Sequence, residues 1–404
     1  MKINFTAKII AAFLSLAVAF AGAASSQNLA DFVSDANDDH FGETSAEANG
    51  VDLGLTCKSA VLMEASTGKI LYAHNESEAL PPASVTKIMT LLLIMEAIDS
   101  GTIGYSDMVT ASANAASMGG SQIYLKEGES MSVDDLLKSI VIASANDAAV
   151  ALAEHIAGSE EAFVSKMNER AAELGMKSTK FENTNGLDDT TEGHLTSALD
   201  IAIMSRELIK HKKILEYSST WMDTIRDGSF GLTNTNRLVR FYQGATGLKT
   251  GSTSKAKFCI SATANKDGME LICVIMAAET RDIRNAEAKT LLDWGYSNYE
   301  LYKCNAENLG KMRVAGSNDC AIDVTGGEFL CVVKKGSASK IQKNTEIYSS
   351  VTAPLKKGDK IGNITLTLGD EVVGNIDIVS GNNVDRIGYF QIFIKMIKSF
   401  FLSA

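Results

Sequence analysis

Three short motifs in this 404-residue chain combine hydroxyl, amine and amide side chains that could carry out acyl transfer. They are Ser84-x-x-Lys87, Ser144-x-Asn146 and Lys249-Thr250-Gly251. Residues three apart lie on one face of a helix, so the Lys87 amine could reach the Ser84 hydroxyl. A lysine acts as a base only while it is neutral, and burial beside a second cation lowers its pKa toward the working pH. The first motif therefore predicts a serine nucleophile activated by a lysine base.

The surroundings of Ser84 distinguish it from other serines with the same spacing. Four further pairs occur, at Ser66/Lys69, Ser252/Lys255, Ser254/Lys257 and Ser337/Lys340. These lie in polar stretches rich in glycine, serine or lysine, which are typical of turns and strand ends. Ser84 instead follows Pro81-Pro82 and precedes the apolar run 91–95, a pattern that predicts the start of a buried helix. The simpler alternative is a helix-capping serine followed by a solvated lysine.

The second motif lies between two predicted helices. Helical periodicity over 133–142 stops at Ser144-Ala145-Asn146-Asp147 and resumes over 148–156. Ser-x-Asn recurs at Ser26, Ser112 and Ser380, whereas Lys-Thr-Gly occurs once in the chain. A short polar segment between buried helices predicts side chains at the wall of a cleft.

Composition and charge exclude several classes of protein. The chain is 45% hydrophobic and 22% charged, as globular proteins are, and its length allows two or three domains. A net charge of -11 without a long basic tract argues against nucleic-acid binding. The six cysteines are scattered, without Cys-x-x-Cys or His-Glu-x-x-His, so we expect no metal site and no cofactor. Disulfides and buried free thiols are both compatible with the sequence.

The N-terminus has the pattern of an export signal. Lys2 and Lys8 are followed by the apolar stretch 9–20 and by Ala21-Gly22-Ala23-Ala24. This pattern predicts a signal peptide at 1–24 and a mature protein outside the cytoplasm, with an uncleaved anchor as the alternative. Residues 25–50, rich in Ser, Asn, Asp and Ala, predict a flexible acidic spacer.

The middle of the chain mixes helical and strand patterns. Strand hairpins are predicted at 59–64 with 70–73, and at 258–264 with 270–277 around Lys266-Asp267-Gly268. Further helices are predicted at 161–174, 197–209 and 285–294, while 244–252 is glycine-rich. We expect an α+β domain over 51–301, with an antiparallel sheet flanked by helices and an all-helical half.

The C-terminal part changes character. Short β-like runs at 329–333, 346–351, 363–368 and 371–378 predict a small all-β domain over 305–380. Residues 384–404 predict an amphipathic helix with a wide apolar face and a polar stripe of Gln391, Lys395 and Lys398. Such a helix is suited to lie on an anionic membrane surface, the alternative being a helix packed on its own protein.

Longer stretches around the motifs resemble one family. They are Pro-Ala-Ser-Val-Thr-Lys-Ile-Met-Thr at 82–90, Ser-Ala-Asn-Asp-Ala-Ala at 144–149, Gly-Leu-Lys-Thr-Gly-Ser-Thr at 247–253 and Leu-Leu-Asp-Trp-Gly-Tyr at 291–296. The three motifs are those of the penicillin-recognising serine enzymes. The longer stretches look like the low-molecular-mass penicillin-binding proteins that are D-alanyl-D-alanine carboxypeptidases. The similarity covers about 55–301, and the β segment and terminal helix match that family's layout.

The resemblance implies a β-lactamase/transpeptidase-like fold and a role for each motif residue. Ser84 would attack the penultimate D-alanine carbonyl, with Lys87 as general base. Ser144 would relay a proton to the departing nitrogen, Asn146 would hold the substrate amide and the Lys87 amine, and Lys249 would keep the site positive. The backbone N–H groups of Ser84 and Ser252 would form the oxyanion hole.

The resemblance also implies a site for the free carboxylate of the substrate. Thr250, Ser252 and Thr253 would supply hydroxyls along the Lys-Thr-Gly strand, which includes Gly251. Arg284 falls where these carboxypeptidases carry a carboxylate-binding arginine, and Arg281 is the alternative. Ser252, where relatives have histidine or an aromatic residue, and Lys257, in place of a small residue, depart from the family pattern. These departures bear on substrate preference or β-lactam affinity.

The implied partners are a peptidoglycan stem peptide, β-lactams as covalent inhibitors and a membrane surface, at the outer face of the cytoplasmic membrane or in the cell-wall space. A secreted β-lactamase is the nearest rival, but Glu182 and Glu192 lack the Glu-x-x-x-Asn setting of its second base. A non-catalytic sensor is disfavoured because every catalytic side chain is present. A Ser-His-Asp esterase lacks its Gly-x-Ser-x-Gly elbow, so His194 is expected to order a loop.

Overall fold

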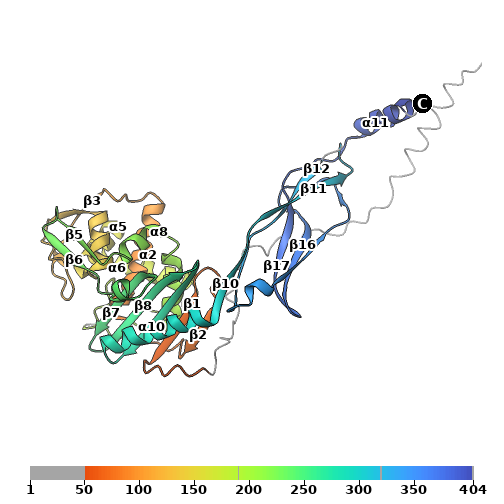
Figure 1. Ribbon diagram of the computed structural model, residues 1–404. Coiled ribbons are helices and arrows are strands. Elements are labelled where there is room, and N and C mark those ends of the chain that lie inside the picture. Colours follow the sequence, from red (N-terminus) through yellow and green to blue (C-terminus); the bar gives the residue numbers. More distant parts are fainter. Residues whose placement is uncertain (1–50, 190, 319–320, 403–404) are drawn as a thin grey trace, which may run out of the picture. The chain divides into compact units, whose positions relative to one another are not determined.

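The computed structural model describes residues 51–189, 191–318 and 321–402, so the predicted signal peptide and spacer lie outside the described residues. Its catalytic part is built on a five-stranded antiparallel sheet with the strand order β2-β1-β9-β8-β7 (Figure 1). The strands are β1 Ser59–Glu64, β2 Ile70–His74, β7 Ala245–Thr253, β8 Lys257–Lys266 and β9 Met269–Ala278. Both predicted hairpins are present, and the predicted α+β class is confirmed.

The sheet is covered on both faces, which explains why β9 is apolar at nearly every position. Leu271, Cys273 and Ile275 belong to one core with helix α10 (Arg281–Asn298). Ile272, Val274 and Met276 point the other way, into the core shared with the helical half. A strand buried on both faces loses the alternation of polar and apolar residues that marks a half-exposed strand.

The helical half lies against the sheet face opposite α10 (Figure 1). Its helices are α2 Lys87–Asp99, α3 Ala113–Ala116, α4 Val133–Ile142, α5 Asn146–Ala157, α6 Glu160–Glu173, α7 Ala198–Leu208 and α8 Lys212–Ser218. Serine side chains cap four of them by accepting from the backbone N–H three residues on, and Ser132, Ser159 and Ser197 cap the three whose starts were predicted. These caps place the helix starts within two residues of the predicted positions.

Short elements complete this part of the chain. They are the turn η1 Ala83–Thr86, the hairpin β3 Met108–Thr110 with β4 Ser130–Ser132, the hairpin β5 Met222–Ile225 with β6 Phe230–Thr233, and helix α9 Leu238–Phe241. Both small hairpins are antiparallel.

Several predicted elements differ from the structure in their bounds, among them the C-terminal helix, which was expected to begin at 384 and begins at Tyr389. Helix α10 begins at Arg281, four residues before the predicted 285, because the Thr280 hydroxyl caps it by accepting from Ile283 N at 3.1 Å. The glycine-rich segment 244–252, where the residue pattern alone predicted no strand and only the family resemblance implied one, forms most of β7. The single strand predicted at 346–351 is wrong, because β14 ends at Ile347 and the two-residue strand β15 begins at Val351.

The C-terminal β domain has a core of its own, which includes Ile322, Ile361, Leu366 and Ile378. Its larger sheet has the order β14-β16-β17-β12-β11-β15, and β10 pairs with β13. The strands are β10 Tyr299–Cys304, β11 Glu307–Ala315, β12 Ala321–Gly326, β13 Phe329–Lys334, β14 Gln342–Ile347, β15 Val351–Thr352, β16 Lys360–Leu368 and β17 Glu371–Ser380, with the turn η2 Ala338–Lys340. Helix α11, Tyr389–Leu402, follows.

The loop 181–197 packs directly against the turn η1 at Gly186. Gly186 has a φ of +85°, and a Cβ built there would lie 1.9 Å from the carbonyl oxygen of Ala83. Gly175 has a similar φ of +71°, but a Cβ there would meet nothing within 4 Å. The two positions share the backbone requirement and differ in the space around them.

We therefore expect Gly186→Ala to destabilise the protein much more than Gly175→Ala. The control substitution should cost about 1 kcal/mol, from the left-handed backbone alone. The Gly186 substitution should cost at least about 3 kcal/mol, because the loop must also move away from η1. Urea unfolding of the two variants measures the difference. Equal free energies of unfolding would show that the loop does not depend on this close approach.

Candidate active site

The nucleophile turn precedes the first catalytic helix. Pro82 is the N-cap of η1, Ala83 has a φ of +49°, and α2 begins at Lys87. Ser84 lies inside η1, half-buried, and its side chain caps neither η1 nor α2. The alternative of a capping serine with a solvated lysine is therefore wrong.

Lys87 is fully buried and its amine meets three oxygen atoms. Nζ lies 2.9 Å from Ser84 Oγ, 2.6 Å from Asn146 Oδ1 and 2.7 Å from the carbonyl oxygen of Asn185. The two carbonyl groups can only accept hydrogen bonds. A neutral amine has two hydrogens, and both are used by these carbonyls. The charged ammonium donates to Ser84 Oγ, and in the neutral form the lone pair of the amine would instead accept a hydrogen bond from the Ser84 hydroxyl.

The electrostatic surroundings favour this neutral form. Burial lowers the pKa of Lys87 well below its usual value, and the positive charge of Lys249 lowers it further. The buried carboxylate of Asp147 acts in the opposite direction and is the weakest of the three influences. The lowered pKa of Lys87 is thus explained mainly by loss of water.

Ser144 and Lys249 form the second pair of the site. Ser144 has a φ of +64° in the segment between α4 and α5, and its Oγ accepts from Lys249 Nζ at 2.8 Å. Lys249 is buried, also donates to the carbonyl of Thr250, and its pKa is lowered to about 7 by burial and by the charge of Arg284. Asn146, the first residue of α5, donates from Nδ2 to the carbonyl of Gly119 at 2.7 Å.

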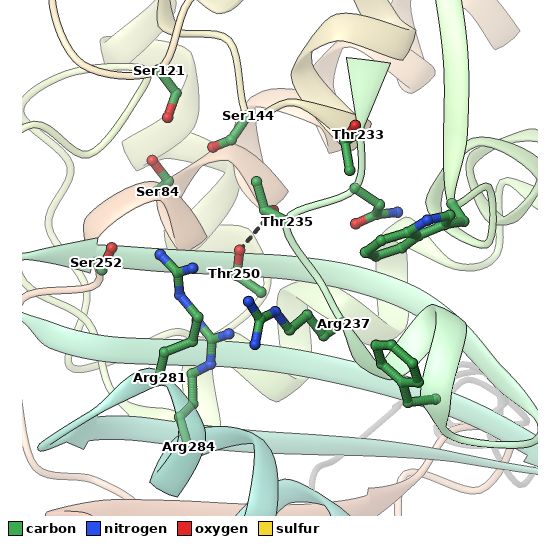
Figure 2. A pocket seen from close by; sticks show the side chains of 14 residues that line it. Ser84, Ser121, Ser144, Thr233, Thr235, Arg237, Thr250, Ser252, Arg281 and Arg284 are labelled. Carbon is green, nitrogen blue, oxygen red and sulfur yellow. Dashed lines mark hydrogen bonds between the residues drawn. The ribbon is translucent and has the colours of Figure 1, made fainter. Parts of the chain in front are cut away.

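Strand β7 lies directly against the nucleophile turn. A Cβ at Gly251 would be 2.8 Å from Ser84 N and 2.9 Å from Val85 N, so only glycine allows this approach. Thr250 and Ser252 line the cleft beside Gly251, and the hydroxyl groups of Thr250 and Thr235 are 2.8 Å apart (Figure 2). The absence of a side chain at Gly251 therefore lets β7 lie close to Ser84.

Thr253, predicted to bind substrate, has a different set of contacts from its neighbours. Its hydroxyl donates to the Asp188 carboxylate and accepts from Ala256 N at 2.9 Å. Lys255 donates to the Asp188 carbonyl at 2.6 Å. Thr253 does not line the cleft and instead ties β7 to the loop 181–197.

The cleft has a volume of about 630 Å³ and is cationic. Arg284 is 3% exposed, lies in the first turn of α10, and donates from Nη1 to the Cys259 carbonyl at 3.4 Å. Burial lowers its pKa to about 10. Arg281 and Arg237 are exposed and line the same cleft, and Figure 2 shows the three guanidinium groups facing the serine side chains. None of the described residues that line the cleft is acidic.

The loop 181–197 supplies contacts that the sequence did not predict. Its Asn185 carbonyl accepts from Lys87, and its Thr184 carbonyl accepts from Thr90 Oγ1 at 2.6 Å. Other lining residues that were missed are Ser121, Trp221, Thr235, Arg237 and Phe241. The polar run Asn183-Thr184-Asn185-Gly186 was the only signal, because backbone acceptors leave no mark in a sequence.

His194 orders this loop, as expected. Its Nδ1 accepts from Glu182 N at 3.0 Å, so Nε2 carries the proton and donates to Thr86 Oγ1 at 2.7 Å. Thr86 in turn donates to the Ala83 carbonyl at 2.8 Å. Burial lowers the pKa of His194 to about 4, so the ring is neutral near neutral pH. Glu182 pairs with Lys180, Glu192 is exposed, and neither lines the cleft.

Comparison with known proteins agrees with this geometry. Residues 43–280 match the model of the peptidase S11 family, described as D-alanyl-D-alanine carboxypeptidase. Residues 296–386 match that of the penicillin-binding protein 5 C-terminal domain. The chain belongs to the D-alanyl-D-alanine carboxypeptidase family. The resemblance noted from the three motifs is confirmed, and these enzymes are low-molecular-mass penicillin-binding proteins.

Individual members of the carboxypeptidase family cover most of the chain. It is 45% identical to D-alanyl-D-alanine carboxypeptidase DacF of Bacillus subtilis over 352 residues, 85% of this chain and 90% of that protein. The crystal structure of penicillin-binding protein 5 from Haemophilus influenzae is 31% identical, with a TM-score of 0.72 over 82% of this chain and 98% of that one. The ampicillin-bound penicillin-binding protein D2 of Listeria monocytogenes is 30% identical, with a TM-score of 0.56 over 61% of this chain and 100% of that one.

The two lysines predict a bell-shaped dependence of kcat/KM on pH. The acid limb reports protonation of Lys87, and the alkaline limb reports loss of the Lys249 charge near the pKa of about 7. A neighbouring positive charge disfavours protonation, so removing it with Arg284→Gln should raise the pKa of Lys249 and move the alkaline limb to higher pH. Penicillin acylation measured across pH gives the profile.

Arg284→Lys is the matched control, because it shortens the side chain but keeps its charge. Its alkaline limb should stay near that of the wild type, whatever happens to the maximal rate. An unmoved limb in Arg284→Gln would mean that Lys249 is not the group that titrates.

Proposed function

We propose that the chain removes the terminal D-alanine from peptidoglycan stem peptides through an acyl-enzyme at Ser84. Membership of the D-alanyl-D-alanine carboxypeptidase family makes it a serine peptidase. The observation that carries the assignment of roles is the set of Lys87 contacts. Two carbonyl acceptors and burial leave the amine lone pair directed at the Ser84 hydroxyl.

Acylation begins when Lys87 takes the Ser84 proton and Oγ attacks the carbonyl carbon of the penultimate D-alanine. The negative charge on the carbonyl oxygen is stabilised by the backbone N–H groups of Ser84 and Ser252, each worth about 3 kcal/mol in such sites. The C–N bond then breaks, and the proton that Lys87 took from Ser84 passes to the departing nitrogen by way of the Ser144 hydroxyl, which leaves Lys87 neutral again for deacylation. Lys249 supports this transfer, since its amine is 2.8 Å from Ser144 Oγ.

Deacylation repeats the chemistry with water as the nucleophile. Lys87 takes a proton from water, the hydroxide attacks the ester carbonyl, and the bond to Ser84 Oγ breaks as that oxygen regains a proton. A β-lactam acylates the same oxygen by opening its ring. Its leaving nitrogen stays attached, which slows the attack of water.

The cationic cleft suits a substrate that ends in a carboxylate. Arg284 is buried at the floor of the cleft, with Thr250 and Ser252 beside it on β7. A buried guanidinium binds a carboxylate strongly, because there is little competing water. We assign the terminal carboxylate to Arg284, Thr250 and Ser252, and Gly251 to the strand that they share.

Export and membrane binding belong to the same proposal. The apolar side chains of α11 are exposed, including Phe390, Phe393, Phe400 and Phe401. No helix among the described residues is long and apolar enough to cross a membrane. At 14 residues, α11 is about 21 Å long, against a hydrocarbon core of ~30 Å. We propose that residues 1–24 export the chain and that α11 lies in the outer surface of the cytoplasmic membrane.

Ser84→Ala should abolish both activities of the site. We expect D-alanine release from a peptide ending in D-Ala-D-Ala to fall at least about 10³-fold, because the nucleophile is lost. No covalent penicillin adduct should be visible by mass spectrometry. Ser337→Ala, which alters another Ser-x-x-Lys serine in the β domain, should keep both. An adduct persisting in Ser84→Ala would place the nucleophile elsewhere, and rapid penicillin turnover by the wild type would favour a β-lactamase.

Deleting residues 386–404 should separate membrane binding from catalysis. The exported full-length chain should float with vesicles containing anionic phospholipid, whereas the truncated chain should stay in solution and release D-alanine at the wild-type rate. Neutral phosphatidylcholine vesicles control for the charge contribution of Lys395 and Lys398. Flotation of the truncated chain would show that another surface binds the membrane.

A further inference from the structure

A second cavity, of about 600 Å³, lies next to the helical half and is built around an exposed tyrosine. We name its four principal side chains, Tyr124, Glu129, Arg226 and Phe230, the Tyr124 platform. Tyr124 is 66% exposed, and its ring is 6.4 Å from that of Phe230 in an edge-on contact. Nothing in the catalytic cycle described above uses these residues.

Tyr124 is held in an unfavourable backbone conformation. Its φ is +59°, a region that large side chains rarely adopt and that costs on the order of 1–3 kcal/mol. The Asp147 carboxylate, 0% exposed, accepts from Ile123 N and from Leu125 N, the amides on either side of Tyr124. A strained residue that a buried carboxylate holds in place, with its ring facing solvent, is more consistent with recognition than with packing.

The polar part of the platform is electrically balanced. Arg226 donates from Nε to Glu129 Oε1 at 2.8 Å and from Nη1 to the Ile123 carbonyl at 2.9 Å, and its guanidinium stacks 5.3 Å from the Phe230 ring centre. Lys126 and Glu127 also line the cavity, so its two positive charges face two negative ones. The catalytic cleft, by contrast, is lined by three arginines and no described acid.

These features suit a neutral saccharide. An exposed aromatic ring packs against the C–H face of a sugar ring, while a neighbouring guanidinium group donates to hydroxyl and amide oxygens at its edge and a carboxylate accepts from hydroxyl and amide hydrogens there. The balanced charge gives no preference for an anion. The cavity volume is within the range of small-ligand sites, about 300–1,000 Å³.

Two chain segments join the platform to the catalytic cleft. Ser121 lines the cleft and Tyr124 lies three residues on, while Thr233 and Phe230 lie at the two ends of β6. Each pair, Ser121 with Tyr124 and Thr233 with Phe230, is three residues apart, so its Cα atoms are separated by at most about 10 Å. The stem peptide between the scissile bond and its amino sugar, taken as about four residues, reaches at most ~14 Å. A sugar attached to the substrate can therefore lie on the platform.

We propose that the Tyr124 platform binds the N-acetyl amino-sugar glycan to which the stem peptide is attached. This inference rests on the proposed function, because it takes peptidoglycan as the substrate. Binding there would add affinity for glycan-linked stems over free peptides, and leave the chemistry at Ser84 unchanged.

The test compares the same pentapeptide ending in D-Ala-D-Ala with and without its disaccharide. For the full-length enzyme we expect Tyr124→Ala to lower the ratio of the two kcat/KM values by about five- to tenfold, the loss of one aromatic contact. Tyr124→Gly, which suits the positive φ, should do the same without backbone strain. Tyr124→Phe should keep the ratio within about twofold. Met108→Ala removes another exposed apolar side chain and serves as the control.

The outcomes separate this inference from the proposed function. If Tyr124→Ala lowers kcat/KM equally for both peptides, the platform contacts the peptide and not the glycan. If kcat/KM is unchanged for both, the platform contacts neither the peptide nor the glycan. Either result overturns the proposal. If the wild type releases no D-alanine from either peptide, the proposed function fails. In that case the inference is tested by saturation-transfer NMR with the disaccharide that carries no peptide. Binding to the wild type that is lost in Tyr124→Ala supports the platform. No binding to the wild type, or binding unchanged in Tyr124→Ala, overturns it.

Discussion

The burial of two lysines in one site is the constraint on which this active site depends. Taking an ammonium group out of water is costly unless a carboxylate is close by, and the hydrogen-bond partners of Lys87 and Lys249 are hydroxyl, amide and carbonyl oxygens. The two amines also repel one another when both are charged. The fold eases this conflict by lowering the pKa of Lys87, which favours the neutral state that could accept a proton from serine.

Of the nine described non-glycine residues with positive φ, several lie at the motifs or at the second cavity. Ala83, Ser144 and Tyr124 all have positive φ values, beside the nucleophile, in the second motif and at the second cavity. Each is held by contacts from elsewhere in the chain: the carbonyl of Ala83 by Thr86, Ser144 by Lys249, and the amides around Tyr124 by Asp147. Such conformations persist only where the surrounding structure determines them, and here that structure is a sheet buried on both faces.

The electrostatics of the chain are local. The whole sequence carries a net charge of -11, yet the catalytic cleft is lined by arginines. The cleft is thus locally positive on a chain of negative net charge, which suits an anionic group, and a low dielectric strengthens that interaction. The balanced charges around Tyr124 and the exposed apolar face of α11 provide two further surfaces, suited to a neutral glycan and to lipid.

The sequence by itself determined the reactive groups and the elements that carry them. Local patterns can be recognised in a sequence. Here they are the serine–lysine spacing at a helix start, the polar break before α5 and the apolar strands of the sheet. The burial of Arg284 rather than Arg281, the strand β7 and the Asn185 carbonyl on Lys87 were decided by the tertiary structure. These features depend on contacts between segments about a hundred residues apart and on glycines that are required because another backbone lies close to them. They also depend on backbone carbonyl oxygens, which every residue has and which therefore give no signal in the sequence. The sequence therefore pointed to Lys87 as the proposed base, and only the packing shows why its pKa is lowered.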